Sequence, residues 1–129
     1  MKTGPAPAGL FLYAKDLEAV ARFYESLIDM RRLHATSEIV VLQSHDVQLI
    51  VHAIPEPIAA TIQIQSPPEK RTRSALKFFF TVPKLATASV LATALGGEVM
   101  SERWAGPGFI AANASDPEGN IFQIREKIL

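Results

Sequence analysis

The chain has 129 residues, 48% of them hydrophobic, and its 13 basic and 13 acidic side chains balance to a formal net charge of zero. This length and composition predict one compact globular domain, and the neutral balance argues against a nucleic-acid or membrane-surface protein. There is no cysteine, which excludes disulfides, thiolate metal sites and a cysteine nucleophile and fits the reducing cytoplasm. The apolar run near the N-terminus is short and soon charged, so neither a signal peptide nor a membrane span is expected.

The first part of the chain predicts a strand, a helix and three further strands. The apolar and aromatic run "GLFLYAK" (9–15) is typical of a buried strand, and Asp16 after it is a suitable helix N-cap. The apolar positions that follow have the spacing of an amphipathic helix: Leu17, Val20, Tyr24, Leu27 and Ile28. Strands are then expected at 31–36, 38–43 and 46–54, the last two joined by a hairpin turn.

Residues 55–74 read as a connector, because they contain four prolines and many polar side chains. A short strand is possible at "TIQIQ" (61–65). The segment is long for a loop in a compact domain, and loops of that length are often functional.

The second part of the chain repeats the order of the first. A strand is expected at 76–82, a helix from Lys84 to the double glycine at 96–97, and strands at 98–104, 108–114 and 120–126. The sequence "DPEG" before the last strand is typical of a type I turn. Leu17 and Leu85 open the two helices 68 residues apart, which indicates an internal repeat.

The predicted fold class is therefore α+β, with two tandem βαβββ modules that form a curved mixed sheet around a cup and helices on its outer face. Module one spans about 7–54, the connector 55–74 and module two about 75–127, all within one domain of residues 1–129. The concave face of such a sheet is a natural site for a small molecule.

Two stretches resemble a known superfamily. "GLFLYAKDLEAVARFYESLI" is similar to the opening strand and helix of the vicinal oxygen chelate superfamily, which includes glyoxalase I, bleomycin-resistance proteins and extradiol dioxygenases, and "DPEGNIFQIRE" is similar to its closing turn and strand. The resemblance covers nearly the whole chain. It implies a single glyoxalase/bleomycin-resistance-like domain and a homodimer, because the cups of this superfamily are often completed across subunits.

The resemblance also implies four metal-ligand positions, two in each module. Counted from the motifs, they fall in this chain on Gly9, Gln48, Lys77 and Gln123. Divalent metals of this class favour imidazole and carboxylate ligands, and this set supplies neither, while Lys77 adds a positive charge. No metal and no other cofactor is therefore expected. If the strand register is misread, a divalent metal site could instead combine His52 with Glu38 or Glu126.

The alternation of side chains along the strands predicts what lines the cup. Aromatic walls, amides and cations would face a small organic ligand that is anionic or aromatic. Trp104, which precedes a Gly-Pro-Gly bend, would close the cup. The expected ligand-binding residues are Phe11, Tyr13, Gln48, His52, Lys77, Phe79, Trp104, Gln123 and Arg125.

Two other functions stay open at this point. The chain could be an enzyme of the lyase, isomerase or dioxygenase type, with or without a metal, in which His52 or a desolvated Lys77 acts as the base. It could also be an interaction module with no ligand. The identity of the ligand, the presence of catalysis, the dimer geometry and whether the cup is open or filled do not follow from the sequence.

Overall fold

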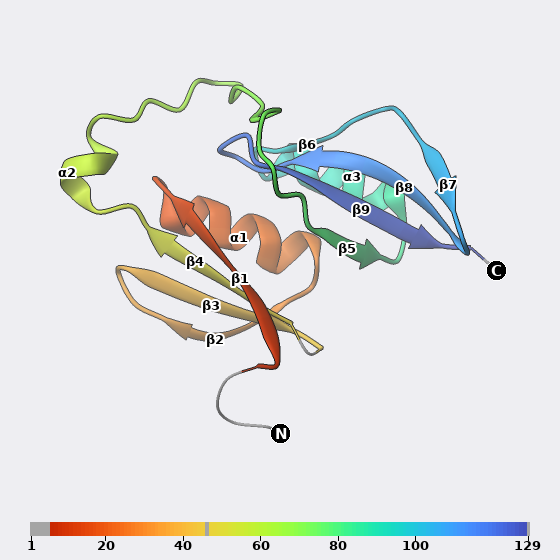
Figure 1. The fold of residues 1–129 in the computed structure, drawn as a ribbon, viewed down its shortest axis with the longest axis horizontal. Helices are drawn as coiled ribbons and strands as arrows, with labels where there is room; N and C mark the ends of the chain where they lie inside the picture. Colours follow the sequence, from red (N-terminus) through yellow and green to blue (C-terminus); the bar gives the residue numbers. More distant parts are fainter. Residues whose placement is uncertain (1–5, 46, 129) are drawn as a thin grey trace.

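The computed structural model describes residues 6–45 and 47–128. Its first half has the predicted β-α-β-β-β order (Figure 1). The predicted hairpin before the fifth element includes Asp46, which lies outside the described residues. The elements of this half are β1 (Ala8–Ala14), α1 (Leu17–Leu27), β2 (Arg31–Ala35), β3 (Ile39–Ser44) and β4 (Val47–Ala53).

The second half repeats this order with one change. Its elements are β5 (Phe79–Val82), α3 (Leu85–Ala94), β6 (Glu98–Val99), β7 (Trp104–Gly106), β8 (Phe109–Ser115) and β9 (Ile121–Lys127). The expectation of one continuous strand over 98–104 was wrong, because that segment is divided into β6 and β7. Between them the Arg103 guanidinium donates hydrogen bonds to the carbonyls of Met100 and Glu102, so these groups are used locally and not in the ladder.

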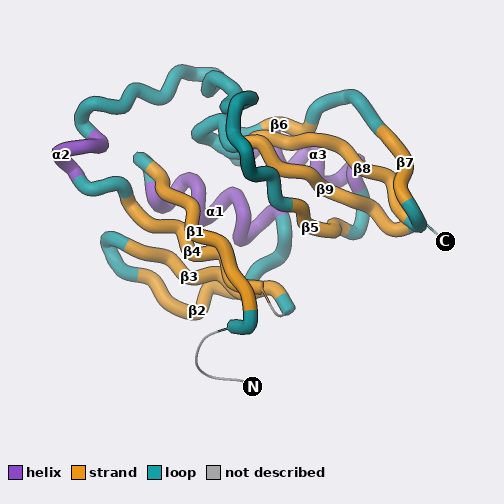
Figure 2. Tube along the Cα trace, viewed as in Figure 1, coloured by secondary structure: helices purple, strands orange, loops and turns teal. Residues whose placement is uncertain are grey.

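The connector contains the short helix α2 (Glu56–Ala59) and is otherwise irregular. The possible strand at 61–65 is not present. After α2 the backbone amides of Thr61 and Ile62 bond back to Ile58 and Ala59, which keeps the start of this segment in a turn. The chain then runs as a loop away from both sheets before it returns between the modules to β5 (Figure 2).

Each module has its own sheet. The strand order is β1-β4-β3-β2 in the first and β5-β9-β8-β6 in the second, where β7 also pairs with β8. The pairs β1–β4 and β5–β9 are parallel and the others antiparallel, so the predicted mixed α+β architecture of two modules is confirmed. The helices α1 and α3 lie behind the sheets, whose other faces turn to the same side (Figure 1).

The predicted alternation along the strands is confirmed by burial. Leu49, Val51, Phe122 and Ile124 are fully buried on the helix side, and with α1 and α3 they form one core across both modules. The side chains of Phe11, Tyr13 and Phe79 point the other way and are 60%, 57% and 53% exposed. Burying one face of each sheet against a helix therefore leaves the opposite face free for a ligand or a partner.

The two motifs that carry the resemblance contact one another in the core. Asp116 of the "DPEG" turn is fully buried, and its Oδ2 accepts a 2.8 Å hydrogen bond from the hydroxyl of Tyr24 on α1. It also accepts from the backbone amides of Glu118 and Asn120 and from Asn120 Nδ2. Burial raises the pKa of Asp116 and, together with the charge of Asp116, raises the pKa of Tyr24 well above 10.

None of the helices in the described part of the chain has the length and apolar composition needed to cross a lipid bilayer.

Candidate functional site

Five of the expected ligand-binding residues come together on the open face of module two. We call Lys77, Phe79, Trp104, Gln123 and Arg125 the cationic cluster. The guanidinium carbon of Arg125 lies 3.6 Å from the ring centre of Phe79 and 4.2 Å from that of Phe109, so the guanidinium has an aromatic ring on two sides. Lys77 Nζ lies 5.9 Å from the ring centre of Trp104. These distances are those of cation–π contacts.

Hydrogen bonds from the cations of the cluster are accepted by two amide oxygens, that of Gln123 in the cluster and that of Asn113 beside it. Arg125 Nε donates to Gln123 Oε1 over 2.6 Å, and Lys77 Nζ donates to Asn113 Oδ1 over 3.2 Å. Gln123 and Asn113 are cross-strand partners on β9 and β8. Because the two amide oxygens face cations, the groups left to a ligand are the amide NH₂ groups, the ammonium and the ends of the guanidinium, which are all donors. This surface suits an anion.

Asn113 and Phe109 are members of this site that the sequence reasoning missed. Both lie on β8, on the same side as Ala111, which pairs with Arg125. The signal was present in the alternation of "GFIAANA", which places Phe109 and Asn113 on one face of the strand. Only the pairing of β8 with β9 shows that this face adjoins Gln123 and Arg125.

The remaining expected residues form a second group on the open face of module one. The rings of Phe11 and Tyr13 are stacked at 6.4 Å, and Tyr13 lies 5.5 Å from the half-buried imidazole of His52. His52 Nδ1 lies 2.8 Å from the carbonyl oxygen of Ala53. A carbonyl oxygen only accepts, so Nδ1 carries the proton and Nε2 is the free acceptor. Gln48 lies opposite Gly9 in the same sheet.

A hollow of about 980 Å³ lies where the edge strand β1 faces the edge strand β5. Gly9, Lys77 and Phe79 line it, together with described residues next to the β3–β4 turn and the end of β5. No hydrogen bond, ion pair or ring contact within the described ranges joins the residues of the cationic cluster to Phe11, Tyr13 or His52. The nine expected residues thus form two groups, and of the nine Lys77 and Phe79 line the hollow.

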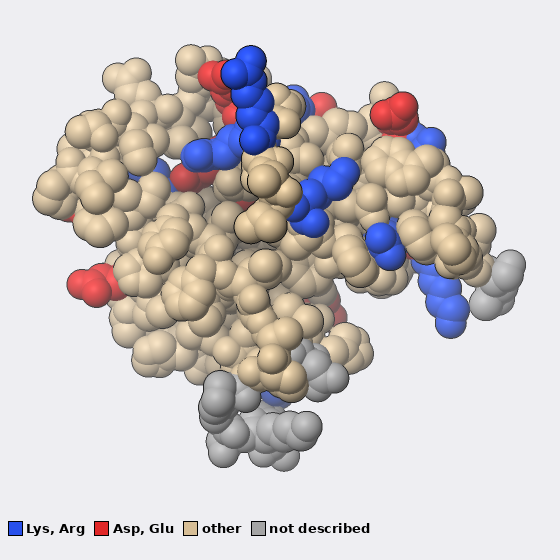
Figure 3. All heavy atoms as spheres, in the orientation of Figure 1, with Lys and Arg blue, Asp and Glu red and all other residues tan. Residues whose placement is uncertain are grey.

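The positive charge of the molecule is unequally distributed between the modules. On the face shown in Figure 3, lysine and arginine side chains gather over the connector and module two, whereas the surface over β1–β4 is mostly uncharged. An anion approaching this side of the molecule therefore meets the cations of module two.

The strand register changes one of the four positions that the resemblance implies for metal ligands. Ala14 pairs with Ala53 in module one, and Val82, its equivalent, pairs with Glu126 in module two. Gln123 lies three residues before Glu126, and Ile50 lies three residues before Ala53. The counterpart of Gln123 is therefore Ile50 and not Gln48. The reason is the turn before each strand: the first hairpin closes at Ser44–Val47 and the second at Ser115–Ile121, so the strands after them are displaced.

The residues at these positions do not fit a divalent metal. With Ile50 in place of Gln48, the set keeps one neutral amide, one lysine and no carboxylate or imidazole. The alternative site with His52 and Glu126 would need residues from different sheets, and Glu126 already accepts a 2.7 Å hydrogen bond from the amide of Leu85. Among the described residues there is no group of three or more His, Cys, Asp or Glu side chains placed to hold a metal ion.

Two βαβββ modules of this kind, each with a helix behind a mixed sheet and an open face in front, define a class of small α+β proteins. The family of the glyoxalase-like domain matches residues 9–125, and the chain belongs to this family. The family assignment and the structural neighbours place it in the vicinal oxygen chelate superfamily, as its motifs indicate. No curated protein matches the chain significantly.

Solved structures of this superfamily are similar along nearly the whole chain. A glyoxalase-related enzyme from Fulvimarina pelagi is 22% identical, with a TM-score of 0.64 over 93% of this chain and 86% of that one. A glyoxalase/bleomycin resistance protein/dioxygenase family enzyme from Burkholderia phytofirmans is 15% identical, with a TM-score of 0.67 over 93% and 97%. The fosfomycin resistance protein FosX from Listeria monocytogenes is 16% identical, with a TM-score of 0.66 over 100% and 97%. At these identities the likeness shows the fold.

Proposed function

We propose that this protein binds a small organic anion with an aromatic body at the cationic cluster, without a resident metal. The observation that carries the proposal is the Arg125 guanidinium held between the rings of Phe79 and Phe109. Packing on both faces of a guanidinium leaves its edge for a ligand, and that edge carries paired N–H donors that match a carboxylate.

The rest of the cationic cluster supports the same class of ligand. Lys77 adds a second positive charge, and the amides of Gln123 and Asn113 have their oxygens occupied by cations. Phe79 and the half-buried Trp104 offer apolar surface for the body of the ligand. A cationic ligand, by contrast, would meet like charges and no carboxylate among the residues of the cluster.

The homodimer and the cytoplasmic location belong to the same proposal. Phe11, Tyr13 and Phe79 are large, more than half exposed, and lie on the edge strands β1 and β5. Exposed apolar side chains beside unpaired strand edges are typical of surfaces that a partner covers. Light scattering coupled to size exclusion tests this, since a single monomer mass at all concentrations would contradict it.

Catalysis is the second candidate function, and His52 is the residue that favours it. Its Nδ1 is fixed by the Ala53 carbonyl, which leaves Nε2 to accept a proton, and Tyr13 lies beside the ring. A metal-free reaction would require the ligand to extend from Arg125 in module two to His52 in module one. Turnover of a bound anion that is lost in the His52→Gln variant, with binding retained, would establish this role.

The binding proposal is tested by titrating the protein with benzoate and following the fluorescence of Trp104, the only tryptophan in the chain. We expect saturable binding, at least about tenfold weaker for benzamide and benzylamine, because neither presents a carboxylate to the guanidinium. The Arg125→Gln variant should lose about tenfold or more in benzoate affinity. Arg22→Gln, an exposed arginine on α1, is the matched control and should bind as the parent does.

Four outcomes would contradict the proposal. Equal binding of benzoate and benzamide, or unchanged binding in Arg125→Gln, would show that the guanidinium does not recognise the charge. No binding of any anion would favour an interaction module. Elemental analysis of untagged protein completes the test, because close to one equivalent of zinc, nickel, iron or manganese per chain would overturn the metal-free reading.

A further inference from the structure

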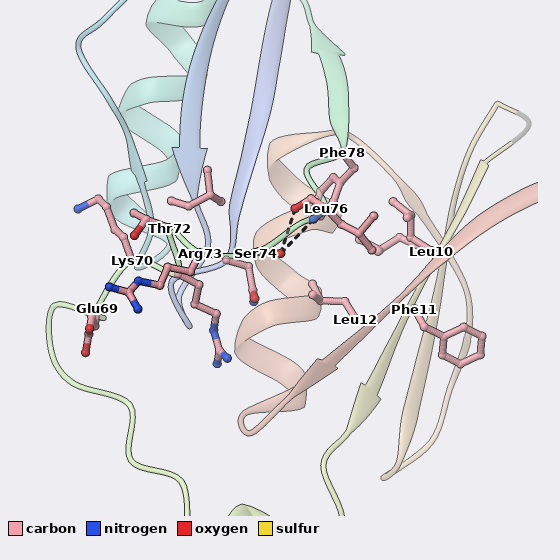
Figure 4. A pocket seen from close by; sticks show the side chains of 14 residues that line it. Leu10, Phe11, Leu12, Glu69, Lys70, Thr72, Arg73, Ser74, Leu76 and Phe78 are labelled. Carbon is pink, nitrogen blue, oxygen red and sulfur yellow. Dashed lines mark hydrogen bonds between the residues drawn. The ribbon is translucent and has the colours of Figure 1, made fainter.

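A second cavity, of about 610 Å³, lies between β1 and the part of the chain that leads from the connector into β5. Figure 4 shows that Leu10 and Leu12 point from β1 toward it, whereas the ring of Phe11 points away. The cavity therefore lies on the helix side of β1, opposite to the open faces that carry the proposed function. Cavities of this size are ordinary for small-molecule sites.

The inner wall of this cavity is aliphatic. Leu10, Leu12 and Leu49 come from module one, and Phe78 closes the wall from module two. Leu49 and the ring of Phe78 belong to the core, where Phe78 stacks on Phe122 at 5.5 Å. Leu76 stands at the mouth and is 80% exposed, the highest value among the large hydrophobic residues of the described chain. Such exposure of leucine beside an apolar wall favours a site that an apolar group covers.

The outer wall is polar and positively charged, and the closing turn of module two holds it in place. The Arg71 amide donates to the Gly119 carbonyl over 2.8 Å, and Arg71 Nε donates to the Glu118 carbonyl over 3.1 Å. Gly119 has a φ of 84°, and a Cβ there would lie 2.0 Å from the Glu69 carbonyl oxygen, so only glycine permits this close approach. Residues 69–71 thus have a fixed position beside the cavity.

Arg73 is the cation of this wall that has no hydrogen bond or ion pair from its side chain to a described residue. Lys70 pairs with Glu98 over 2.9 Å, and Arg71 donates to the closing turn, but no ion pair or side-chain hydrogen bond of Arg73 is formed within residues 6–45 and 47–128. The hydroxyl side chain of Thr72 precedes it, whereas Ser74 Oγ, which follows it, already donates to the Leu76 carbonyl over 3.1 Å. An unpaired guanidinium beside a hydroxyl and an aliphatic wall is complementary to a ligand with an anionic head and an aliphatic tail.

We propose that this cavity is a second binding site, for an amphipathic anion of the medium-chain carboxylate type. The carboxylate binds at Arg73 with the Thr72 hydroxyl beside it, and the unbranched chain lies along Leu10, Leu12 and Phe78 under Leu76. The aliphatic wall distinguishes this site from the cationic cluster, where aromatic rings surround the cations. The proposal does not depend on the function of the cationic cluster, because no residue of that cluster lines this cavity.

Isothermal titration with decanoate below its micellar concentration tests the proposal. We expect one decanoate per chain, with decylamine binding at least about tenfold more weakly because its charge is repelled by Arg73. Arg73→Gln should weaken decanoate binding about tenfold, and Leu76→Ala by a smaller factor. Both residues are exposed, so neither change threatens the fold. Arg22→Gln, which removes an exposed cation of α1 that does not line the cavity, is the matched control and should leave decanoate affinity unchanged.

The two sites are distinguished by competition. Saturating benzoate should leave the affinity for decanoate unchanged, and decanoate should leave the fluorescence of Trp104 unchanged, since Trp104 does not line the cavity. The proposal is overturned if decanoate does not bind, if decylamine binds equally well, or if Arg73→Gln leaves decanoate binding unchanged. A Leu76→Ala variant that dissociates a dimer and binds decanoate as before would also overturn it, because the cavity would then be an interface.

Discussion

The helices of the two modules begin in different ways. The helix α1 has its own N-cap, Asp16, which accepts from the amide of Ala19, and in addition a carboxylate from the other module. That carboxylate is Glu118, 3% exposed, which accepts from the amides of Lys15 and Asp16 over 2.9 and 2.7 Å. The helix α3 has no side-chain cap at Lys84, and the amide of Leu85 is bound by Glu126 of its own module.

This difference shows that the repeat is symmetric in its elements but not in its contacts. The closing turn of module two binds the start of α1 through Glu118 and the middle of α1 through the Asp116–Tyr24 hydrogen bond. Module one therefore depends on a polar turn that belongs to module two, whereas α3 depends on its own last strand. Charge-assisted hydrogen bonds of this kind are worth about 1.5–3 kcal/mol each, so the dependence is measurable.

Removing the centre of the contact between the modules should have the largest effect. Asp116→Ala leaves the Tyr24 hydroxyl, two backbone amides and the Asn120 amide without their buried acceptor. We expect a loss of about 3–5 kcal/mol in the free energy of unfolding, measured by urea denaturation. Glu102→Ala, at an exposed position, is the control and should leave the midpoint unchanged. A loss equal to that of the control would mean that the turn does not join the modules.

A matched pair of substitutions compares the contributions of Glu118 and Glu126 to the two helix starts. Glu118→Gln removes the charge between two amides and turns an NH₂ group toward one of them. Glu126→Gln can keep its hydrogen bond from Leu85 through the amide oxygen and loses only a 3.8 Å ion pair with the exposed Lys84. We expect losses of about 1–3 kcal/mol and less than about 1 kcal/mol, respectively. Hydrogen exchange of the first turns should rise in α1 for the first variant and in α3 for the second. Equal losses in the free energy of unfolding would show that the two helix starts depend equally on these carboxylates.

The smallest effect on stability at neutral pH is expected for Tyr13→Phe. This variant serves to follow the Tyr24–Asp116 contact at alkaline pH. The variant leaves Tyr24 as the only tyrosine. The pKa of Tyr24 is raised above its unfolded value by burial and by Asp116, so its contribution to stability is complete below the unfolded pKa and is lost as the pH rises through the folded pKa. Phenolate absorbance and helical circular dichroism should therefore change together above about pH 10. Phenolate formation while the helices persist would show that Tyr24 is accessible.

The open faces of the modules differ as clearly as their helix starts. Module one presents Phe11, Tyr13 and His52, whereas module two presents Lys77 and Arg125 between aromatic rings. The alternation of the strands predicted both faces, because period-two patterning depends on local sequence alone. It did not predict Asn113 or Phe109, whose role depends on which strand pairs with β9.

The irregular parts of the chain were less predictable for a physical reason. The residues of 61–65 alternate as a strand does, yet no sheet edge meets them, and a strand without a partner is not stable. The division of 98–104 into β6 and β7 lies in the pairing with β8: Val99 pairs with Ala114 and Trp104 with Ala111, so five steps on one strand oppose three on the other. No pattern of apolar residues encodes this mismatch. The counterpart of Gln123 in module one depends on the lengths of two hairpin turns. A turn of different length displaces a strand along its neighbour without changing the alternation of its side chains, so the pattern does not reveal it.

By itself the sequence determined the order of the elements, the repeat and the buried side of each strand, because helix and strand periods and turn residues act over a few neighbouring positions. It also determined the superfamily, through the "DPEG" turn and the Phe23–Tyr24 helix. Only the tertiary structure decided which cations meet which rings, that Asp116 and Glu118 hold α1, and that Arg73 faces a leucine-lined cavity. These depend on contacts between residues distant in the chain, whose distances are set by the packing of two modules into one core.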